Sequence, residues 1–112
     1  MQLPVEQCQD VAVALLPVEE LDASNASEFK ADVSPLLEEN TRLVLDLARL
    51  RFVDSSGLGA LISCLRKINS RGGDLKLCAM SEQVRTLFEL VRLHKVFDIY
   101  ATRQEAVRAF GS

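Results

Sequence analysis

The sequence predicts an α/β fold with a mixed, mostly parallel β-sheet of four to five strands packed with about four α-helices. Short apolar runs typical of strands alternate with longer segments in which apolar residues recur every three or four positions, as on one face of a helix. Crossover connections are right-handed, so consecutive strands of this order should be parallel. The chain has 112 residues, the length of one domain, and we expect residues 1–112 to form a single domain.

Four segments have the composition of strands: residues 11–16, 42–47, 75–79 and 96–100. The first is a nearly continuous apolar run, which is typical of a strand buried on both faces, and Pro17 ends it. Residues 3–9 are expected to add an antiparallel strand at the edge of the sheet. The pair Gly72-Gly73 indicates a turn before the third of these strands.

The first predicted helix follows from the helical spacing of Ala26, Phe29, Val33, Leu36 and Leu37. Asp22 or Ser24 could cap it, and Pro35 should kink or break it because proline lacks an N–H and crowds the preceding turn.

Three more helices are predicted farther along the chain. The apolar positions that define them are Leu58, Leu61, Ile62, Leu65 and Ile68 in the second, Val84, Leu87, Phe88 and Val91 in the third, and Ala106, Val107 and Phe110 in the last. Ser81 can cap the third helix, and the residues from Thr102 to Glu105 form a capping box for the last.

Composition excludes several classes of function. The 13 basic and 16 acidic residues give a net charge of −3, which argues against nonspecific nucleic-acid binding. No apolar run approaches the ~20 residues of a membrane helix, and the N-terminus lacks the pattern of a signal peptide, so we expect a cytoplasmic protein without membrane insertion. Three cysteines without paired spacing and a single histidine predict no metal site, and Cys64 and Cys78 are expected in the core.

The segment Asp54-Ser55-Ser56-Gly57-Leu58-Gly59 is the least ordinary part of the chain. In parallel sheets the functional loops lie at the carboxyl ends of the strands, and residues 17–24 and 51–59 are two such loops that could lie side by side. Ser55 or Ser56 could cap the following helix, and Gly57 would relax its first turn. Two glycines, each lowering helix stability by up to about 1 kcal/mol, indicate that another backbone or protein surface approaches closely.

Known catalytic motifs are absent from this segment. The spacing of its glycines and serines fits neither a phosphate-binding Walker loop, nor a dinucleotide fingerprint, nor a nucleophile elbow. A hydrolase that uses Ser55 with His94 and an aspartate is an alternative that the sequence leaves open.

The string from Phe52 to Gly59 resembles the phosphorylation loop of the anti-sigma factor antagonists, the small bacterial proteins of the STAS domain family. The turn Glu20-Leu21-Asp22 is similar to the acidic turn that lies beside this loop in the family. The pair Gly72-Gly73, the pair Cys78-Ala79 and the pattern Ser81-x-x-Val84-x-x-Leu87-Phe88 also follow the family, so the resemblance covers nearly the whole chain.

The resemblance implies a STAS-like domain that is a switch and a substrate rather than an enzyme, with no cofactor. Its unphosphorylated form would bind an anti-sigma factor that is also a serine kinase of the histidine-kinase-like ATPase fold, and so release a sigma factor. Phosphorylation on Ser55 would end this binding, and a PP2C-type serine phosphatase would restore it. The protein would be monomeric alone. The implied partner surface comprises Glu20, Leu21, Asp22, Ser24, Asp54, Ser56, Gly57, Leu58 and Gly59.

Some residues of this surface have a second interpretation. Leu21 and Leu58 could contact the partner or belong to the core, and Leu58 fits the core stripe of its helix. Asp22 and Asp54 should cap helices, and could also orient the ATP-bound loop of the kinase or its Mg²⁺.

The sequence departs from the family at two positions. Glu19 stands where glycine is usual before the acidic turn, and Pro35 interrupts a helix that is normally unbroken. The alternative function is a STAS subunit that is not phosphorylated and belongs to a transporter or a stress-signalling assembly.

Overall fold

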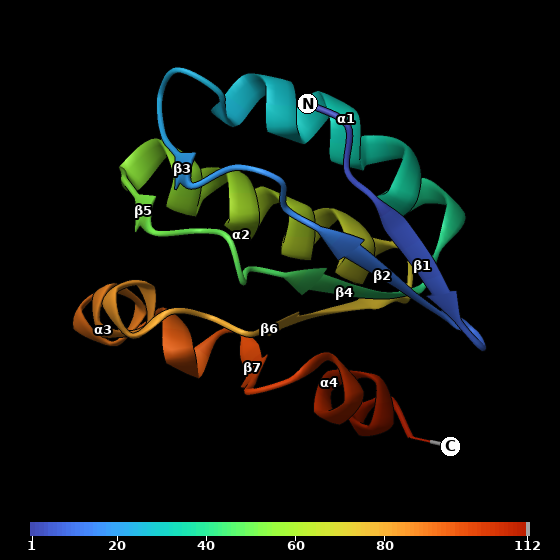
Figure 1. The fold of residues 1–112 in the computed structure, drawn as a ribbon. Helices are drawn as coiled ribbons and strands as arrows, with labels where there is room; N and C mark the ends of the chain where they lie inside the picture. Colours follow the sequence, from blue (N-terminus) through green and yellow to red (C-terminus); the bar gives the residue numbers. More distant parts are fainter. Residues whose placement is uncertain (112) are drawn as a thin grey trace.

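A five-stranded sheet forms the centre of the protein in the computed structural model, which describes residues 1–111 (Figure 1). Its strand order is β1-β2-β4-β6-β7. The strands are β1 (Val5–Cys8), β2 (Val11–Leu15), β4 (Arg42–Asp46), β6 (Asp74–Cys78) and β7 (Asp98–Tyr100). Only β1 runs antiparallel to its neighbour. The predicted mostly parallel sheet, its antiparallel edge strand and the burial of β2 are confirmed.

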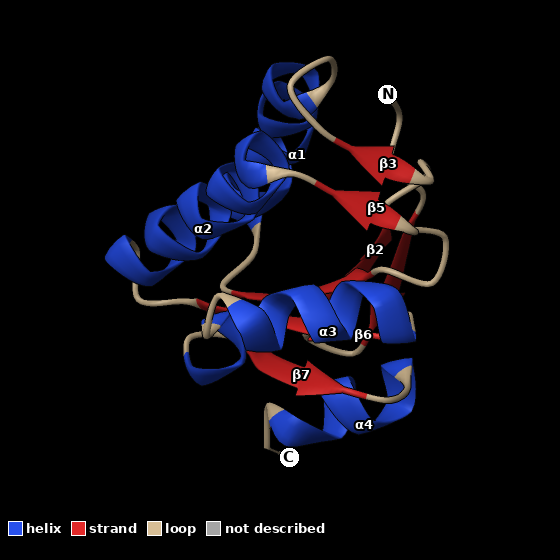
Figure 2. Cartoon of the chain, turned by 90° about the vertical axis from the view of Figure 1, so that its left-hand side faces the viewer, coloured by secondary structure: helices blue, strands red, loops and turns tan. Residues whose placement is uncertain are grey.

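Helices cover both faces of this sheet. Figure 2 shows α1 (Ala26–Glu39) and α2 (Ser55–Ser70) on one side and α4 (Arg103–Ala109) on the other. The larger apolar core lies on the α1–α2 side and also receives Val84 and Phe88 of α3 (Glu82–Leu90). A smaller core under α4 contains Val44, Cys78 and Ala106. No helix within residues 1–111 is both long and apolar enough to cross a membrane.

A second sheet of two very short strands lies beside the first. It pairs β3 (Glu20–Leu21) with β5 (Phe52–Val53) in parallel. Both strands lie between a strand of the main sheet and a helix: β3 follows β2 and precedes α1, and β5 follows β4 and precedes α2. The sequence pattern predicts loops, not strands, at both segments.

Helix α1 differs from its prediction at two points. It continues through Pro35 without a break, since Phe29 and Val33 before the proline and Leu37 after it are all buried in the same core. Its N-cap position is Asn25 rather than Asp22 or Ser24, and this residue makes no side-chain capping bond.

The region between α3 and β7 also differs from the prediction. Val91 follows the end of α3 and is 47% exposed rather than buried. The chain then forms a 3-10 helix, η1 (Leu93–Lys95), so Val96 is exposed and the strand begins only at Asp98. The caps predicted for α3 and α4 are confirmed, because Ser81 and Thr102 each accept a bond from the backbone N–H three residues later.

Two charged residues are buried beneath α4, and each is paired. Asp46 accepts a bond from Arg103 at the start of α4. Lys76 contacts Asp98 at 2.9 Å and lies 4.7 Å from the ring centroid of Phe110. Burial opposes the charge of Lys76, but its hydrogen bonds to Asp98 and Asp74 raise its pKa above the ordinary value. The Arg103–Asp46 pair and the contact of Lys76 with Phe110 join α4 to the sheet, while the Lys76–Asp98 pair links β6 to β7.

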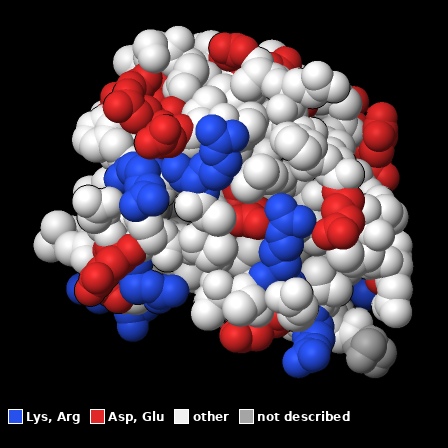
Figure 3. All heavy atoms as spheres, in the orientation of Figure 1, with Lys and Arg blue, Asp and Glu red and all other residues white. Residues whose placement is uncertain are grey.

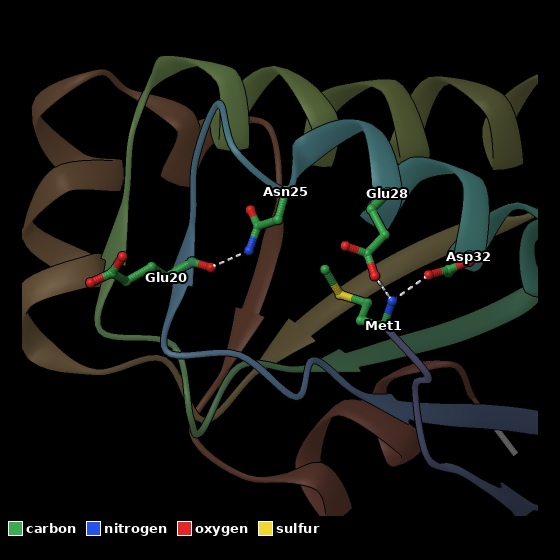
Figure 4. Close-up of polar contacts among 5 residues, drawn as sticks. All are labelled: Met1, Glu20, Asn25, Glu28 and Asp32. Carbon is green, nitrogen blue, oxygen red and sulfur yellow. Dashed lines mark hydrogen bonds and ion pairs between the residues drawn. The ribbon is translucent and has the colours of Figure 1, made fainter.

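The core holds two buried cysteines, and the amino terminus is paired with α1. Cys64 and Cys78 are buried as predicted, and burial raises the pKa of each thiol to about 12. The amino group of Met1 contacts Glu28 and, at 2.7 Å, Asp32, both on α1 (Figure 4).

Candidate functional site

The pairing of β3 with β5 brings the two suspected loops together, as the sequence analysis expected. Leu21 is opposite Val53, and the backbone N–H groups of Arg51 and Asp54 donate to the carbonyls of Glu19 and Leu21 at 2.7 and 3.2 Å. The ladder continues almost to the first residue of α2. The position of this helix is therefore set by β3 as well as by its own sequence.

Asp54 joins the two loops through its carboxylate. Its Oδ1 accepts the backbone N–H of Gly57 at 2.9 Å, which caps α2, and its Oδ2 accepts the backbone N–H of Ala23 at 3.2 Å. A carboxylate at a helix N-terminus is also favoured by the helix dipole. The capping role expected of Asp54 is confirmed, and the one offered for Ser55 or Ser56 is wrong.

Ser55 and Ser56 are therefore the first two residues of α2, and both are exposed. The hydroxyl of Ser55 makes no hydrogen bond to another residue within the described chain, so it is available to a reagent from solution. Ser56 turns toward a hollow of about 400 Å³ between the first turns of α1 and α2, which Gly59 also lines. The two neighbouring serines thus face different surroundings.

The two glycines of the segment have different roles. A Cβ on Gly57 would lie 2.2 Å from the carbonyl oxygen of Leu21 and 2.6 Å from a methyl of Val53. Glycine is required there because the backbone of β3 approaches the helix too closely for any side chain. A Cβ on Gly59 would meet nothing within 4 Å, so this glycine leaves a bare patch on the exposed side of the helix.

The turn before α1 is held by its own polar side chains. The carboxylate of Asp22 accepts the backbone N–H and the hydroxyl of Ser24 at 2.9 and 2.6 Å, and the Ser24 hydroxyl is the largest cause of the lowered pKa of Asp22. Asn25 accepts the N–H of Asp22 and donates to the carbonyl of Glu20 at 2.8 Å (Figure 4). Asn25 was not predicted as a cap, although an asparagine directly before a helical apolar stripe is a recognised N-cap signal.

The proposed partner residues differ in their accessibility. Glu20, Ser24, Ser56 and Gly59 are exposed, while Asp22, Asp54 and Leu58 are half-buried. The side chain of Leu21 is fully buried, so in this conformation it cannot contact a partner. Gly57 is buried as well and has no side chain. The burial of Leu21 identifies it as a core residue.

The arrangement does not support a hydrolase that uses Ser55. His94 is exposed in η1, which precedes the amino end of β7, whereas Ser55 lies past the carboxyl end of β4. Within residues 1–111 His94 makes no hydrogen bond to Ser55 or to an aspartate, so the structure assembles no nucleophile–base pair at Ser55.

Comparisons with known proteins agree with this fold. Residues 3–106 match the model of the family described as "STAS domain". The anti-sigma-B factor antagonist of Bacillus subtilis is 30% identical over 80% of this chain and 82% of its own length. An anti-sigma factor antagonist from Mycobacterium paratuberculosis has a similar structure, with a TM-score of 0.84 at 26% identity over 96% of this chain and 92% of its own.

The antagonist SpoIIAA of Bacillus has solved structures in two states. The unphosphorylated form matches at a TM-score of 0.78 and 26% identity, covering 96% of this chain and 95% of its own, and the phosphorylated form at 0.70 and 25%, covering 96% and 98%.

A murine anion transporter, Slc26a9, contains a similar domain, with a TM-score of 0.79 over 91% of this chain and 18% of its own. At 18% identity this likeness shows the shared fold alone. The family match and the relative at 30% identity both extend over most of the sequence. This chain belongs to the STAS domain family.

Proposed function

We propose that this protein is an anti-sigma factor antagonist controlled by phosphorylation of Ser55. The unphosphorylated form binds an anti-sigma factor that is also a serine kinase of the histidine-kinase-like ATPase fold, and so releases the sigma factor. The kinase transfers phosphate to Ser55, and the complex dissociates. A serine phosphatase of the PP2C type removes the phosphate, and the protein has no catalytic role of its own. It acts in the cytoplasm as a monomer that forms complexes with its partners.

The observation that carries this proposal is the placement of Ser55. Its hydroxyl is exposed and free of hydrogen bonds within residues 1–111, on a first turn that Asp54 holds rigidly. The carboxylates of Asp54, Asp22 and Glu20 surround the loop pair, and none of them is buried. The site therefore offers an accessible phosphate acceptor within an acidic rim.

Charge can operate this switch without a large change of shape. A phosphate on Ser55 adds about −1.5 to −2 charges and lies near the N-terminus of α2, where the helix dipole stabilises an anion by about 0.3–1 kcal/mol. The phosphorylated domain should therefore remain folded. A partner that fits the unmodified rim then faces a much more negative surface, and a penalty of ~3 kcal/mol would weaken the complex about 150-fold.

The acidic rim also suits the kinase reaction. Glu20, Asp22 and Asp54 lie on the two paired loops beside Ser55, where the ATP-bound part of the partner would dock. Their carboxylates can orient basic side chains of the kinase or the Mg²⁺ that it holds with ATP. The hollow beside Ser56 and Gly59 can receive a partner side chain.

The test is reconstitution with the serine kinases of this fold from the host bacterium. Purified wild-type protein should bind one of them and take up one phosphate from ATP, on Ser55. Ser55→Ala should still bind but remain unmodified, and Ser55→Asp should bind at least about tenfold more weakly.

Thr102→Asp is the matched control. It adds the same charge at the N-cap of α4, on the other face of the sheet, and aspartate preserves the cap. It should bind and be phosphorylated like the wild type. Uptake of phosphate by Ser55→Ala, or unchanged binding of Ser55→Asp, would contradict the proposal.

A further inference from the structure

The segment that leads from β4 into β5 carries an unusual set of exposed side chains. Arg49, Arg51 and Phe52 are exposed, and Phe52 keeps 52% of its surface accessible, while Leu50 and Val53 are buried. We call these three exposed residues the Arg–Phe patch. Figure 3 shows basic side chains next to acidic ones at the left of this face, over the region of β3 and the segment entering β5.

The two arginines of the patch have no partner inside the described part of the protein. Neither guanidinium forms an ion pair or a hydrogen bond with residues 1–111, whereas Arg42 and Arg103 are paired with Asp10 and Asp46. Glu20 on β3 is directly opposite Phe52, and Glu19 precedes it, but neither carboxylate is bridged to these arginines. Within four consecutive residues, 49–52, the described surface therefore carries two cations without a partner and an exposed aromatic ring.

The backbone of the patch is fixed. The backbone N–H of Leu50 donates to the carbonyl of Leu47 at 3.1 Å, and the backbone N–H groups of Arg51 and Phe52 both donate to the backbone carbonyl of Glu19, at 2.7 and 3.1 Å. Burial of Leu50 anchors the segment between its two arginines. A surface that is ordered before binding loses little backbone entropy on association. Arginine and aromatic side chains are also enriched among residues that dominate interfaces.

We propose that the Arg–Phe patch is the second half of the docking surface for the kinase partner, and that it receives an acidic region of that partner next to an apolar contact for Phe52. This inference rests on the proposed function. Phe52 precedes Ser55 by three residues, so their Cα atoms are at most about 11 Å apart. Both halves fit within one interface of ordinary size, about 800 Å² on each partner.

Charge complementarity is the reason for assigning the Arg–Phe patch to the kinase partner. The rim around Ser55 is negative and requires basic groups opposite, whereas the Arg–Phe patch requires acidic ones. A partner with both regions can dock in only one orientation, because a reversed complex would place like charges in contact. The patch would thus set the direction in which Ser55 is presented to the kinase.

The test measures binding of the unphosphorylated protein to the kinase identified by its action on Ser55. The double variant Arg49→Glu/Arg51→Glu should bind at least about tenfold more weakly, and its affinity should depend less on salt concentration. The control Arg66→Glu/Lys95→Glu makes the same change of net charge at two exposed positions without ion pairs within the described chain, on α2 far from Ser55 and on η1. It should bind within about threefold of the wild type.

The outcomes separate this inference from the function on which it rests. If wild-type protein neither binds nor is phosphorylated, the proposed function fails and the inference fails with it. If the wild type binds, and the arginine double variant binds equally well or no worse than its control, the inference alone is overturned. Thermal unfolding of the charge-reversal variant shows whether it is folded. If it is not, the binding measurement is repeated with Arg49→Ala/Arg51→Ala, which removes the two positive charges without adding negative ones. This variant should also bind more weakly than the wild type, and equal binding would overturn the inference.

Discussion

Asp54 is the residue on which the geometry of the site depends. One carboxylate oxygen caps α2 through Gly57, and the other holds Ala23 in the loop before α1. Since each oxygen has its own backbone donor, the side chain fixes Ser55 relative to the acidic turn at Asp22. This arrangement is a positioning role, distinct from any contact with a partner.

We therefore predict two effects of Asp54→Ala. Loss of the cap should lower the free energy of unfolding by about 1 kcal/mol, and loss of the bridge to Ala23 should slow phosphorylation of Ser55 by the kinase. Urea denaturation and the rate of phosphate uptake measure the two effects separately.

Thr102→Ala is the control for Asp54→Ala, because it removes the N-cap of α4. It should lose similar stability without any change in phosphorylation. Equal slowing in both variants would mean that Asp54 acts only through stability.

The helix N-caps show which single-residue roles can be predicted from local sequence and which cannot. Ser81 and Thr102 were predicted correctly, since each is followed directly by a regular helical pattern. At α2 three consecutive residues, Asp54, Ser55 and Ser56, could all cap a helix. The bond from the N–H of Asp54 to β3 settles where the strand ends and α2 begins, and that long-range contact is not visible in the local sequence.

The close contact between α2 and β3 is the main structural feature at the scale of elements. The first turn of the helix lies against the backbone of Leu21, and only glycine at position 57 leaves room for it. One turn later no such contact exists, so Gly59 is not required by the fold. Gly57 is therefore required by the fold, whereas Gly59 shapes the exposed surface of the helix.

Alanine at each position should separate these roles. Gly57→Ala forces backbone and side-chain shifts and should cost about 1–3 kcal/mol of stability. Gly59→Ala should raise stability by up to about 1 kcal/mol, because glycine is a poor helix former, yet its methyl group should weaken binding of the kinase. Chemical denaturation and affinity measurements on both variants test this pair. A stable Gly57→Ala, or a Gly59→Ala that binds as well as the wild type, would contradict the assignment.

Secondary structure was predictable where the pattern was long. The four main strands and four helices follow from apolar periodicity, and the antiparallel edge strand was also expected. Strands β3 and β5 have two residues each, too short to show any period, and only their mutual pairing defines them. At Pro35 the local rule predicted a kink or a break, and α1 runs through this residue unbroken, with apolar residues buried on both sides of it.

At the scale of the whole molecule, the site is built outside the main sheet and depends on it for rigidity. The carboxyl ends of β2 and β4 lead into β3 and β5, and the same core supports α1 and α2 beneath them. The net charge of −3 conceals an uneven surface, with an acidic rim around Ser55 and the Arg–Phe patch beside it. The net charge predicted neither the acidic rim nor the Arg–Phe patch, because the distribution of charge on the surface depends on which loops the fold brings together.

The most direct test of the switch is to isolate the protein from its host under several growth conditions and to map phosphate by peptide mass spectrometry. The proposal predicts phosphate on Ser55, present under some conditions and absent under others, with the adjacent Ser56 unmodified. Fragment ions between the two serines distinguish them. Absence of phosphate under every condition, or phosphate confined to Ser56, would contradict control by Ser55 and favour a STAS subunit that binds its partners constitutively.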